Sequence, residues 1–309
     1  MGLNVVVVGA GRWGSALGAT AARNGHRVTL WSVREGLTPV SGCLRSTDLS
    51  CARHAAVIVF TVPPENARTM ARELAPHTGP NAVILHAVRG LTDEPVCTIG
   101  DVLQQETCVR RIGALGGPVL VSELEEGTPA LFVCGSPFPE VLSLAKEMLG
   151  NKVTRVAVTS DRRGVEWSSA LVACLALGVG YVQGAGFGPG LVSAVTSEAV
   201  REAARFVVVA GGQEATMLGL AGYGDLLAAM AQENRPEVVV GRILASGKSV
   251  AEAEKAIGQR VVATDLAPKL LRWAEAHKLS LPLLGSLARG AFSRKPAREV
   301  VTSWIERAL

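Results

Sequence analysis

The sequence of 309 residues lacks the features that mark several classes of protein. Charged residues make up 19% and the formal net charge is +4, so neither an acidic tail nor a basic stripe for nucleic acid is indicated. The 34 glycines follow no fixed period, and 48% of the residues are hydrophobic, which excludes collagen-like and disordered chains. The six cysteines include no C-x-x-C pair, so we expect reduced thiols in a cytoplasmic protein and no metal site. The first apolar run is short and leads directly into a glycine-rich turn, so we expect no secretory leader.

Charge is also absent from a long internal stretch. No charged side chain occurs from Trp167 to Ser197, a length that would suffice for a membrane span. Glycines and a proline break the stretch between Gly184 and Gly190, and Ser168, Ser169 and Gln183 interrupt its apolar face. The sequence therefore predicts a buried central helix and no membrane span.

The order of short apolar runs indicates the fold class. Strand-like runs at 5–8, 28–31, 56–60, 83–85 and 131–134 alternate with helical spacing at 16–23, 64–74 and 139–149. This alternation predicts an α/β fold with an N-terminal Rossmann doubly wound parallel sheet. After about Thr159 only helical spacing persists, at 193–209, 226–231, 251–257, 267–277 and 298–309. We therefore expect a dinucleotide-binding domain at 1–159 and an all-helical substrate domain at 160–309.

A glycine-rich turn follows the first predicted strand. The sequence Gly9-Ala-Gly11-Arg-Trp-Gly14 fits G-x-G-x-x-G between a strand of four valines and a helix. The first glycine permits a tight turn, the second lets the backbone approach a pyrophosphate, and the third lets helix and strand pack closely. The helix N-terminus then offers free N–H groups and a positive dipole end to the phosphates. The context predicts binding of NAD or NADP.

The end of the second predicted strand bears on the choice of cofactor. A site selective for NAD usually has Asp or Glu there, and this chain has Ser32 and Arg34 instead. These side chains would suit a 2′-phosphate, but a solvated Arg34 fits the pattern equally well. The predicted cofactor contacts are Gly9, Gly11, Arg12, Trp13, Gly14, Ser32, Arg34 and Pro63.

A series of motifs in order along the chain resembles the bacterial-type NAD(P)-dependent glycerol-3-phosphate dehydrogenases. The matching segments cover about residues 4 to 290 and include 9–17, Val62-Pro63, Arg89-Gly90-Leu91, Gly117-Pro118, Glu123, 127–129, 164–166, Ala170-Leu171 and 219–226. The resemblance implies a Rossmann domain, a helical C-terminal domain and the reduction of dihydroxyacetone phosphate. It also implies a homodimer, since members of this family are commonly dimers.

Several active-site positions depart from the family pattern. The family's Ala-Leu-Lys-Asn falls on Ala170, Leu171, Val172 and Ala173, so its presumed proton donor is absent. An expected Thr is Ala229, and a Glu-Gly pair falls on Val262-Ala263. Arg89 stands where the family has Lys. The phosphate-binding Ser-Arg-Asn falls on 235–237, where Arg235 matches the family Arg only after a shift of one residue.

Few side chains remain to replace the lost proton donor. No Lys occurs between Lys152 and Lys248, and no His between His86 and His277. Asp225 is the predicted catalytic residue, with a structural cap of the following helix as an equal alternative. Glu166 is expected to be structural, and His86 is expected on the surface. Arg89 and Arg235 are the predicted contacts of a small anionic substrate.

Three hypotheses follow. The first is an NAD(P)H-dependent oxidoreductase acting on dihydroxyacetone phosphate, as the resemblance implies. The second is a catalytically impaired paralogue that binds NAD(P) as a sensor or partner subunit. The third is a reductase of a different small anionic carbonyl compound, such as the precursor of a hydroxy acid that Arg89 and Arg235 would bind.

Overall fold

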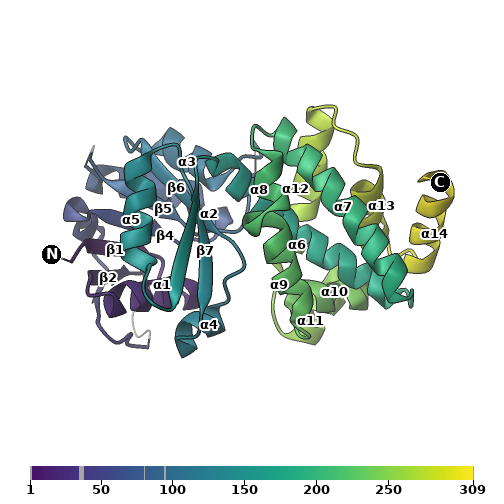
Figure 1. The fold of residues 1–309 in the computed structure, drawn as a ribbon, viewed down its shortest axis with the longest axis horizontal. Helices are drawn as coiled ribbons and strands as arrows, with labels where there is room; N and C mark the ends of the chain where they lie inside the picture. Colours follow the sequence, from purple (N-terminus) through teal and green to yellow (C-terminus); the bar gives the residue numbers. More distant parts are fainter. Residues whose placement is uncertain (1, 35–37, 80, 94, 309) are drawn as a thin grey trace. The chain divides into compact units, whose positions relative to one another are not determined.

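The computed structural model describes residues 2–34, 38–79, 81–93 and 95–308 (Figure 1). The chain divides into two compact units, 1–166 (unit 1) and 167–309 (unit 2). Unit 1 holds the sheet and unit 2 is built from helices, which confirms the predicted fold class. The predicted domain boundary after Thr159 coincides with the end of the last strand, which is Thr154–Thr159. The division into domains at this residue stays a prediction.

The sheet of unit 1 has eight strands in the order β3-β2-β1-β4-β5-β6-β7-β8. Their bounds in this order are Cys43–Ser46, Arg27–Trp31, Asn4–Val8, Val57–Phe60, Val83–His86, Arg111–Gly116, Ala130–Gly135 and Thr154–Thr159. All neighbouring strands pair in parallel except β6 and β7, which are antiparallel. The prediction of a parallel sheet was therefore wrong at this one pairing, because β7 follows β6 through the short helix α4 (Val121–Glu126) and returns beside it.

Helices cover both faces of the sheet, and the alternation along β1 shows this directly. Val5 and Val7 belong to a core with residues of α1 (Arg12–Arg23), α4 and α5 (Pro139–Leu149). Val6 and Val8 belong to the other core, with residues of η1 (Leu49–His54), α2 (Pro64–Leu74) and α3 (Ile99–Glu106). A short 3-10 turn, η2 (Ala75–His77), follows α2. Burial on both faces explains why the central strands are nearly continuous apolar runs.

Helix α6 begins at Arg162 in unit 1, and the rest of it, from Trp167, belongs to unit 2. In chain order its elements are α6 (Arg162–Gly184), α7 (Pro189–Val209), α8 (Glu214–Leu218), the π-helical turn η3 (Leu220–Gly224), α9 (Asp225–Ala231), α10 (Pro236–Leu244), α11 (Val250–Ile257), α12 (Val262–Ala276), α13 (Pro282–Phe292) and α14 (Ala297–Ala308). Ser249 and Glu252 form a capping box at the start of α11, in which each side chain accepts the backbone N–H of the other residue.

The charge-free stretch forms two helices, as its glycines predicted. Helix α6 ends at Gly184 and α7 begins at Pro189. Helix α6 is long and apolar enough to cross a membrane by length and composition, but 94% of its most apolar window is buried. This burial confirms the predicted central core helix and is typical of a helix enclosed by protein.

Candidate functional site

The glycine-rich turn has the backbone geometry that the sequence predicts. Gly9 has φ +111°, a conformation that a residue with a side chain rarely adopts. A Cβ on Gly14 would overlap the carbonyl oxygen of Gly9. A Cβ on Gly11, in contrast, would meet nothing within 4 Å, so the space beside Gly11 is open. Two glycines are thus required by the fold, and the third leaves room for a ligand.

Helix α1 begins at this turn without a side-chain cap. Gly11 is its N-cap residue in an extended conformation, and no acidic side chain lies in the first turn. The first intrahelical bond runs from the Ser15 N–H to the Gly11 carbonyl at 2.8 Å. The N–H groups of the first turn are therefore available to acceptors from outside the helix. This arrangement fits the diphosphate of a dinucleotide.

Two hydrogen bonds fix the turn against neighbouring strands. The Thr61 hydroxyl, directly after β4, donates to the carbonyl oxygen of Gly9 at 2.7 Å. The Trp13 indole N–H donates to the carbonyl oxygen of Ala87, directly after β5, at 2.9 Å. Sequence reasoning missed Thr61, although its place between β4 and Val62-Pro63 was a usable signal. The turn is thereby attached to the carboxyl ends of both strands.

The other predicted cofactor contacts lie at or near the same edge of the sheet. Ser32 follows β2, and its hydroxyl accepts the Arg34 N–H at 3.1 Å. Arg34 is exposed, and the next three residues lie outside the described part of the chain. Arg12 is exposed and pairs with Glu125 of α4 at 2.7 Å. Pro63 is the N-cap residue of α2. The part these residues take in cofactor binding stays a prediction.

The end of β5 holds a buried charged cluster. His86 is 2% exposed, so the expectation of a surface histidine was wrong. The Nε2 of His86, the last residue of β5, is 2.7 Å from Oε1 of Glu166 on α6. Glu166 also accepts the Gly100 N–H at 2.7 Å and pairs with Arg162 at 3.1 Å. These contacts fit the expected structural role of Glu166, which stays a prediction.

The hydrogen-bonding and charged partners of Glu166 determine the direction of its pKa shift. Burial alone would raise the pKa of Glu166, but the hydrogen bond from His86 and the charge of Arg162 hold it below its usual value. Arg162 is itself paired with Asp101 at 3.1 Å. Within the described ranges of the chain, no group of three or more His, Cys, Asp or Glu side chains lies close enough to hold a metal ion.

In unit 2, Asp225 follows the π-helical turn η3. It is the first residue of α9, it has right-handed helical backbone angles, and its exposure is 4%. The N-cap residue of α9 is Gly224 and not Asp225. The alternative of a structural role for Asp225 at this helix stays a prediction as well. π-Helical turns are frequent at functional sites. A catalytic role for Asp225 stays a prediction.

Arg235 is the N-cap residue of α10, and most of its side chain is buried. Its Nε is 2.6 Å from Glu237 Oε2, and the two side chains are only 17% and 10% exposed. An anionic ligand at Arg235 would therefore compete with the Glu237 carboxylate.

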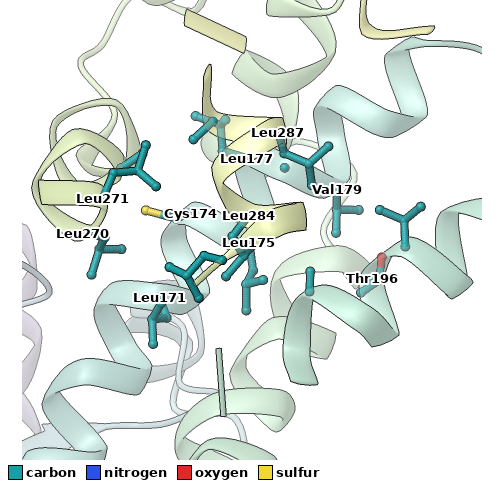
Figure 2. Close-up of a pocket in the computed structure, with 16 residues that line it drawn as sticks. Leu171, Cys174, Leu175, Leu177, Val179, Thr196, Leu270, Leu271, Leu284 and Leu287 are labelled. Atoms are coloured by element: carbon teal, nitrogen blue, oxygen red, sulfur yellow. The ribbon is translucent and has the colours of Figure 1, made fainter. Parts of the chain in front are cut away.

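Unit 2 also contains an apolar cavity of about 50 Å³ (Figure 2). Leu171, Cys174, Leu175 and Gly178 line it from one face of α6, and α7, α12 and α13 supply the other walls. Neither Asp225 nor Arg235 lines it. An apolar cavity that binds benzene has a volume of about 150 Å³, so this smaller one is a gap in the packing rather than the substrate site.

Comparison with known families agrees with this geometry. Residues 4–41 and 43–141 match the family described as NAD-dependent glycerol-3-phosphate dehydrogenase N-terminus, and residues 161–302 match the corresponding C-terminus. The chain belongs to the NAD-dependent glycerol-3-phosphate dehydrogenase family. It is therefore an oxidoreductase of a family that uses NAD or NADP.

Curated relatives match the dehydrogenase over nearly its whole length. The glycerol-3-phosphate dehydrogenase [NAD(P)+] of Agathobacter rectalis is 26% identical over 98% of this chain and 96% of the relative. The enzyme of the same name from Pectobacterium atrosepticum is 29% identical over the same shares. The crystal structure of glycerol-3-phosphate dehydrogenase from Coxiella burnetii has a TM-score of 0.90, with 24% identity and 99% of each chain covered, and so shows the same fold.

The departures from the family pattern lie mostly inside the helical unit. Val172 and Ala173 are fully buried on α6, and Ala229 of α9 is 1% exposed. Val262, at the start of α12, is 41% exposed. Three of the four positions where the resemblance implies polar side chains are therefore enclosed by protein and carry small or apolar side chains. A glycerol-3-phosphate dehydrogenase of this sequence needs another source of the proton.

Proposed function

We propose that this chain reduces dihydroxyacetone phosphate to sn-glycerol 3-phosphate with NADH or NADPH. The names of its curated relatives support the substrate. The open space beside Gly11 at an uncapped helix N-terminus is the observation that carries the proposal. Bound NADH or NADPH would supply the hydride for the carbonyl carbon.

The residues of unit 1 hold the reactants. The first-turn N–H groups of α1 bind the diphosphate, with contacts from Arg12, Trp13 and Pro63. Ser32 and Arg34 lie at the end of β2, where the adenosine ribose binds in this fold, and they allow a 2′-phosphate. Arg89 binds the anionic group of the substrate through its planar guanidinium.

The residues of unit 2 complete the reaction. Asp225, as a neutral carboxylic acid, gives its proton to the developing alkoxide and is restored from solvent. Asp225 is 4% exposed and directly follows the π-helical turn η3, and such turns are frequent at functional sites, which supports this assignment. Arg235 binds the substrate phosphate once that phosphate replaces Glu237 as its partner.

The organisation of the protein is part of the proposal. Residues 1–159 are the dinucleotide-binding domain and residues 160–309 the helical substrate domain. The chain works as a cytoplasmic homodimer and binds no nucleic acid. The family resemblance supports the dimer, and the modest net charge of +4 argues against a nucleic-acid surface.

The deciding experiment measures NADH and NADPH oxidation with dihydroxyacetone phosphate, beside equilibrium titration of both dinucleotides. Turnover together with binding supports the proposed function. Binding without turnover of any anionic carbonyl compound would instead identify a sensor or partner subunit. The absence of binding by either dinucleotide would overturn both.

A matched pair of variants tests the placement of the cofactor. Gly11 and Gly188 are both N-cap glycines in extended conformations, and a Cβ would meet nothing within 4 Å at either. Gly11→Ala should raise the dinucleotide Kd by about 10-fold or more, a free-energy change of about 1.4 kcal/mol, because its methyl group would meet the diphosphate. Gly188→Ala should leave the Kd unchanged. Equal effects in both variants would contradict the placement.

A further inference from the structure

Arg89 lies on a connection between β5 and α3 whose described residues are 87–93 and 95–98. Leu91 and Thr98 pair as an antiparallel bridge, and the Thr92 N–H donates to the Cys97 carbonyl at 3.1 Å. The far part of the connection is therefore closed on itself. Arg89 and Gly90 lie between this closed part and the end of β5.

A single carboxylate binds both ends of the connection. His86, the last residue of β5, contacts Glu166 Oε1 through Nε2 at 2.7 Å. The Gly100 N–H, in the first turn of α3, donates to the same oxygen at 2.7 Å. The three residues His86, Gly100 and Glu166 all belong to unit 1. The residue before the Arg89 connection, His86, and a residue just after it, Gly100, therefore contact the same Glu166 oxygen.

The surroundings show that these contacts tolerate little change. His86 and Glu166 side chains are 2% and 3% exposed. The Nδ1 of His86 is buried and makes no hydrogen bond, so the network assigns the ring proton to Nε2 as the donor. A Cβ on Gly100 would overlap the Arg162 guanidinium and Glu166 Oε1. A Cβ on Gly90 would overlap Pro64, which begins α2. The backbone is therefore closely packed against Pro64 at Gly90, and against Arg162 and Glu166 at Gly100.

We infer that Glu166 is a positioning residue that acts through Arg89. By accepting hydrogen bonds from His86 and Gly100, Glu166 sets where the Arg89 guanidinium meets the anionic group of the substrate. Glu166 itself touches neither substrate nor cofactor. The inference rests on the proposed function for the identity of the substrate, and on the geometry of unit 1 for the rest.

The test is a double-mutant cycle between Glu166 and Arg89. Glu166→Gln should raise the KM for dihydroxyacetone phosphate and the Kd for sn-glycerol 3-phosphate by about 10-fold, the scale of a charge-assisted hydrogen bond. The dinucleotide Kd should stay constant. In the Arg89→Ala background, Glu166→Gln should add no further increase, because residues that act as a unit are not additive. Additive losses, or a fall in thermal stability with unchanged KM, would overturn the inference.

Two further variants separate positioning from general stability. His86→Gln retains an N–H donor toward Glu166 and should restore most of the affinity that His86→Leu loses. Glu123→Gln is the control, because Glu123 accepts the Leu120 N–H at 3.0 Å at the start of α4, a contact that involves no residue of the Arg89 connection. It should leave the KM unchanged. An equal KM increase in Glu123→Gln, or no difference between the two His86 variants, would contradict the role of Glu166.

Amide hydrogen exchange gives a readout that needs no turnover. Glu166→Gln should speed exchange of the Thr92 and Gly100 amides, whereas Glu123→Gln should not. Unchanged exchange at both amides would overturn the inference even in an active enzyme. If the wild-type protein neither reduces dihydroxyacetone phosphate nor binds sn-glycerol 3-phosphate, the proposed function fails, and exchange still decides whether Glu166 holds the connection.

Discussion

The cofactor turn of unit 1 and the central helix of unit 2 differ in what carries their chemistry. The turn depends on backbone geometry, with Gly9 at positive φ and Gly14 against the Gly9 carbonyl. The face of α6 that the resemblance assigns to catalysis depends on side chains, and here it carries the buried Val172 and Ala173. A binding feature made by backbone persists as long as the glycines do. A catalytic feature made by side chains changes with one substitution and leaves the fold intact.

The largest expected effect comes from giving the helix its missing polar side chains. Val172→Lys with Ala173→Asn should raise kcat for dihydroxyacetone phosphate by about 10²-fold or more, because a positioned proton donor contributes about 10²–10⁴-fold. In this double variant, Asp225→Asn should cost less activity than it costs in the wild type. Steady-state kinetics of the four proteins provide the measurement.

Val172→Met with Ala173→Asn is the control for that gain. Methionine has the length of lysine without an amine, so the control should show no rise in kcat. A folded lysine variant with normal dinucleotide affinity and no gain would mean that the helical unit has been remodelled beyond these two positions. A gain in the methionine variant would mean that packing, and not proton donation, limits the rate.

Backbone contacts persist in unit 2 as well, and breaking one should have the next largest effect. Helices α6 and α10 pack closely at Gly180, because a Cβ on this residue would overlap the carbonyl oxygen of Val238. Gly180→Ala should lower the free energy of unfolding by about 1–3 kcal/mol through overpacking. Gly178→Ala, two residues away on the same helix, faces the cavity with Leu287 at 3.6 Å. It should be neutral or gain up to about 1 kcal/mol from helix propensity. Urea denaturation compares the two, and equal losses would refute the contact.

The sequence predicted β1, β4 and β5 well because both faces of these three strands are buried. Helix α2 and helix α5 were predicted with the bounds that the structure has, since each begins with proline. Strand β3 was missed, because it lies at the sheet edge and has no fully buried residue. Strand β6 was missed, because Gly113 and Gly116 interrupt its apolar pattern. Edge position and glycine content weaken the local signal that sequence reasoning uses.

The candidate site was predictable where it depends on local geometry. The Gly9–Gly14 turn follows a strand and starts a helix in consecutive residues, so the glycine spacing together with this local context identifies it. The cluster of His86 and Glu166 joins residues 80 positions apart, and no local pattern could place His86 in the interior. The pairing of Arg235 with Glu237 was likewise hidden, although the two are near neighbours, because spacing does not show which partner a guanidinium takes.

The smallest expected effect concerns two buried glutamates with opposite pKa shifts. Burial raises the pKa of Glu202, even though Glu202 accepts the N–H groups of Leu283 and Leu284 at the start of α13 at 3.0 and 2.9 Å. The pKa of Glu166 is lowered. The Glu202 contribution to stability is complete below the pKa of the unfolded chain, about 4.3, and declines as pH rises through the folded-state pKa. The Glu166 contribution is present above that value and declines as pH falls.

Glutamine variants should therefore respond to pH with opposite sign. The stability advantage of wild type over Glu202→Gln should shrink as pH rises above about 4.3, by about 1 kcal/mol or less because Arg205 lies 3.9 Å from the carboxylate. The advantage over Glu166→Gln should shrink in the other direction, as pH falls below about 4.3. Urea denaturation across this range measures both. Slopes of the same sign would show that the partners of Glu166, namely His86, Arg162 and the Gly100 N–H, do not outweigh its burial.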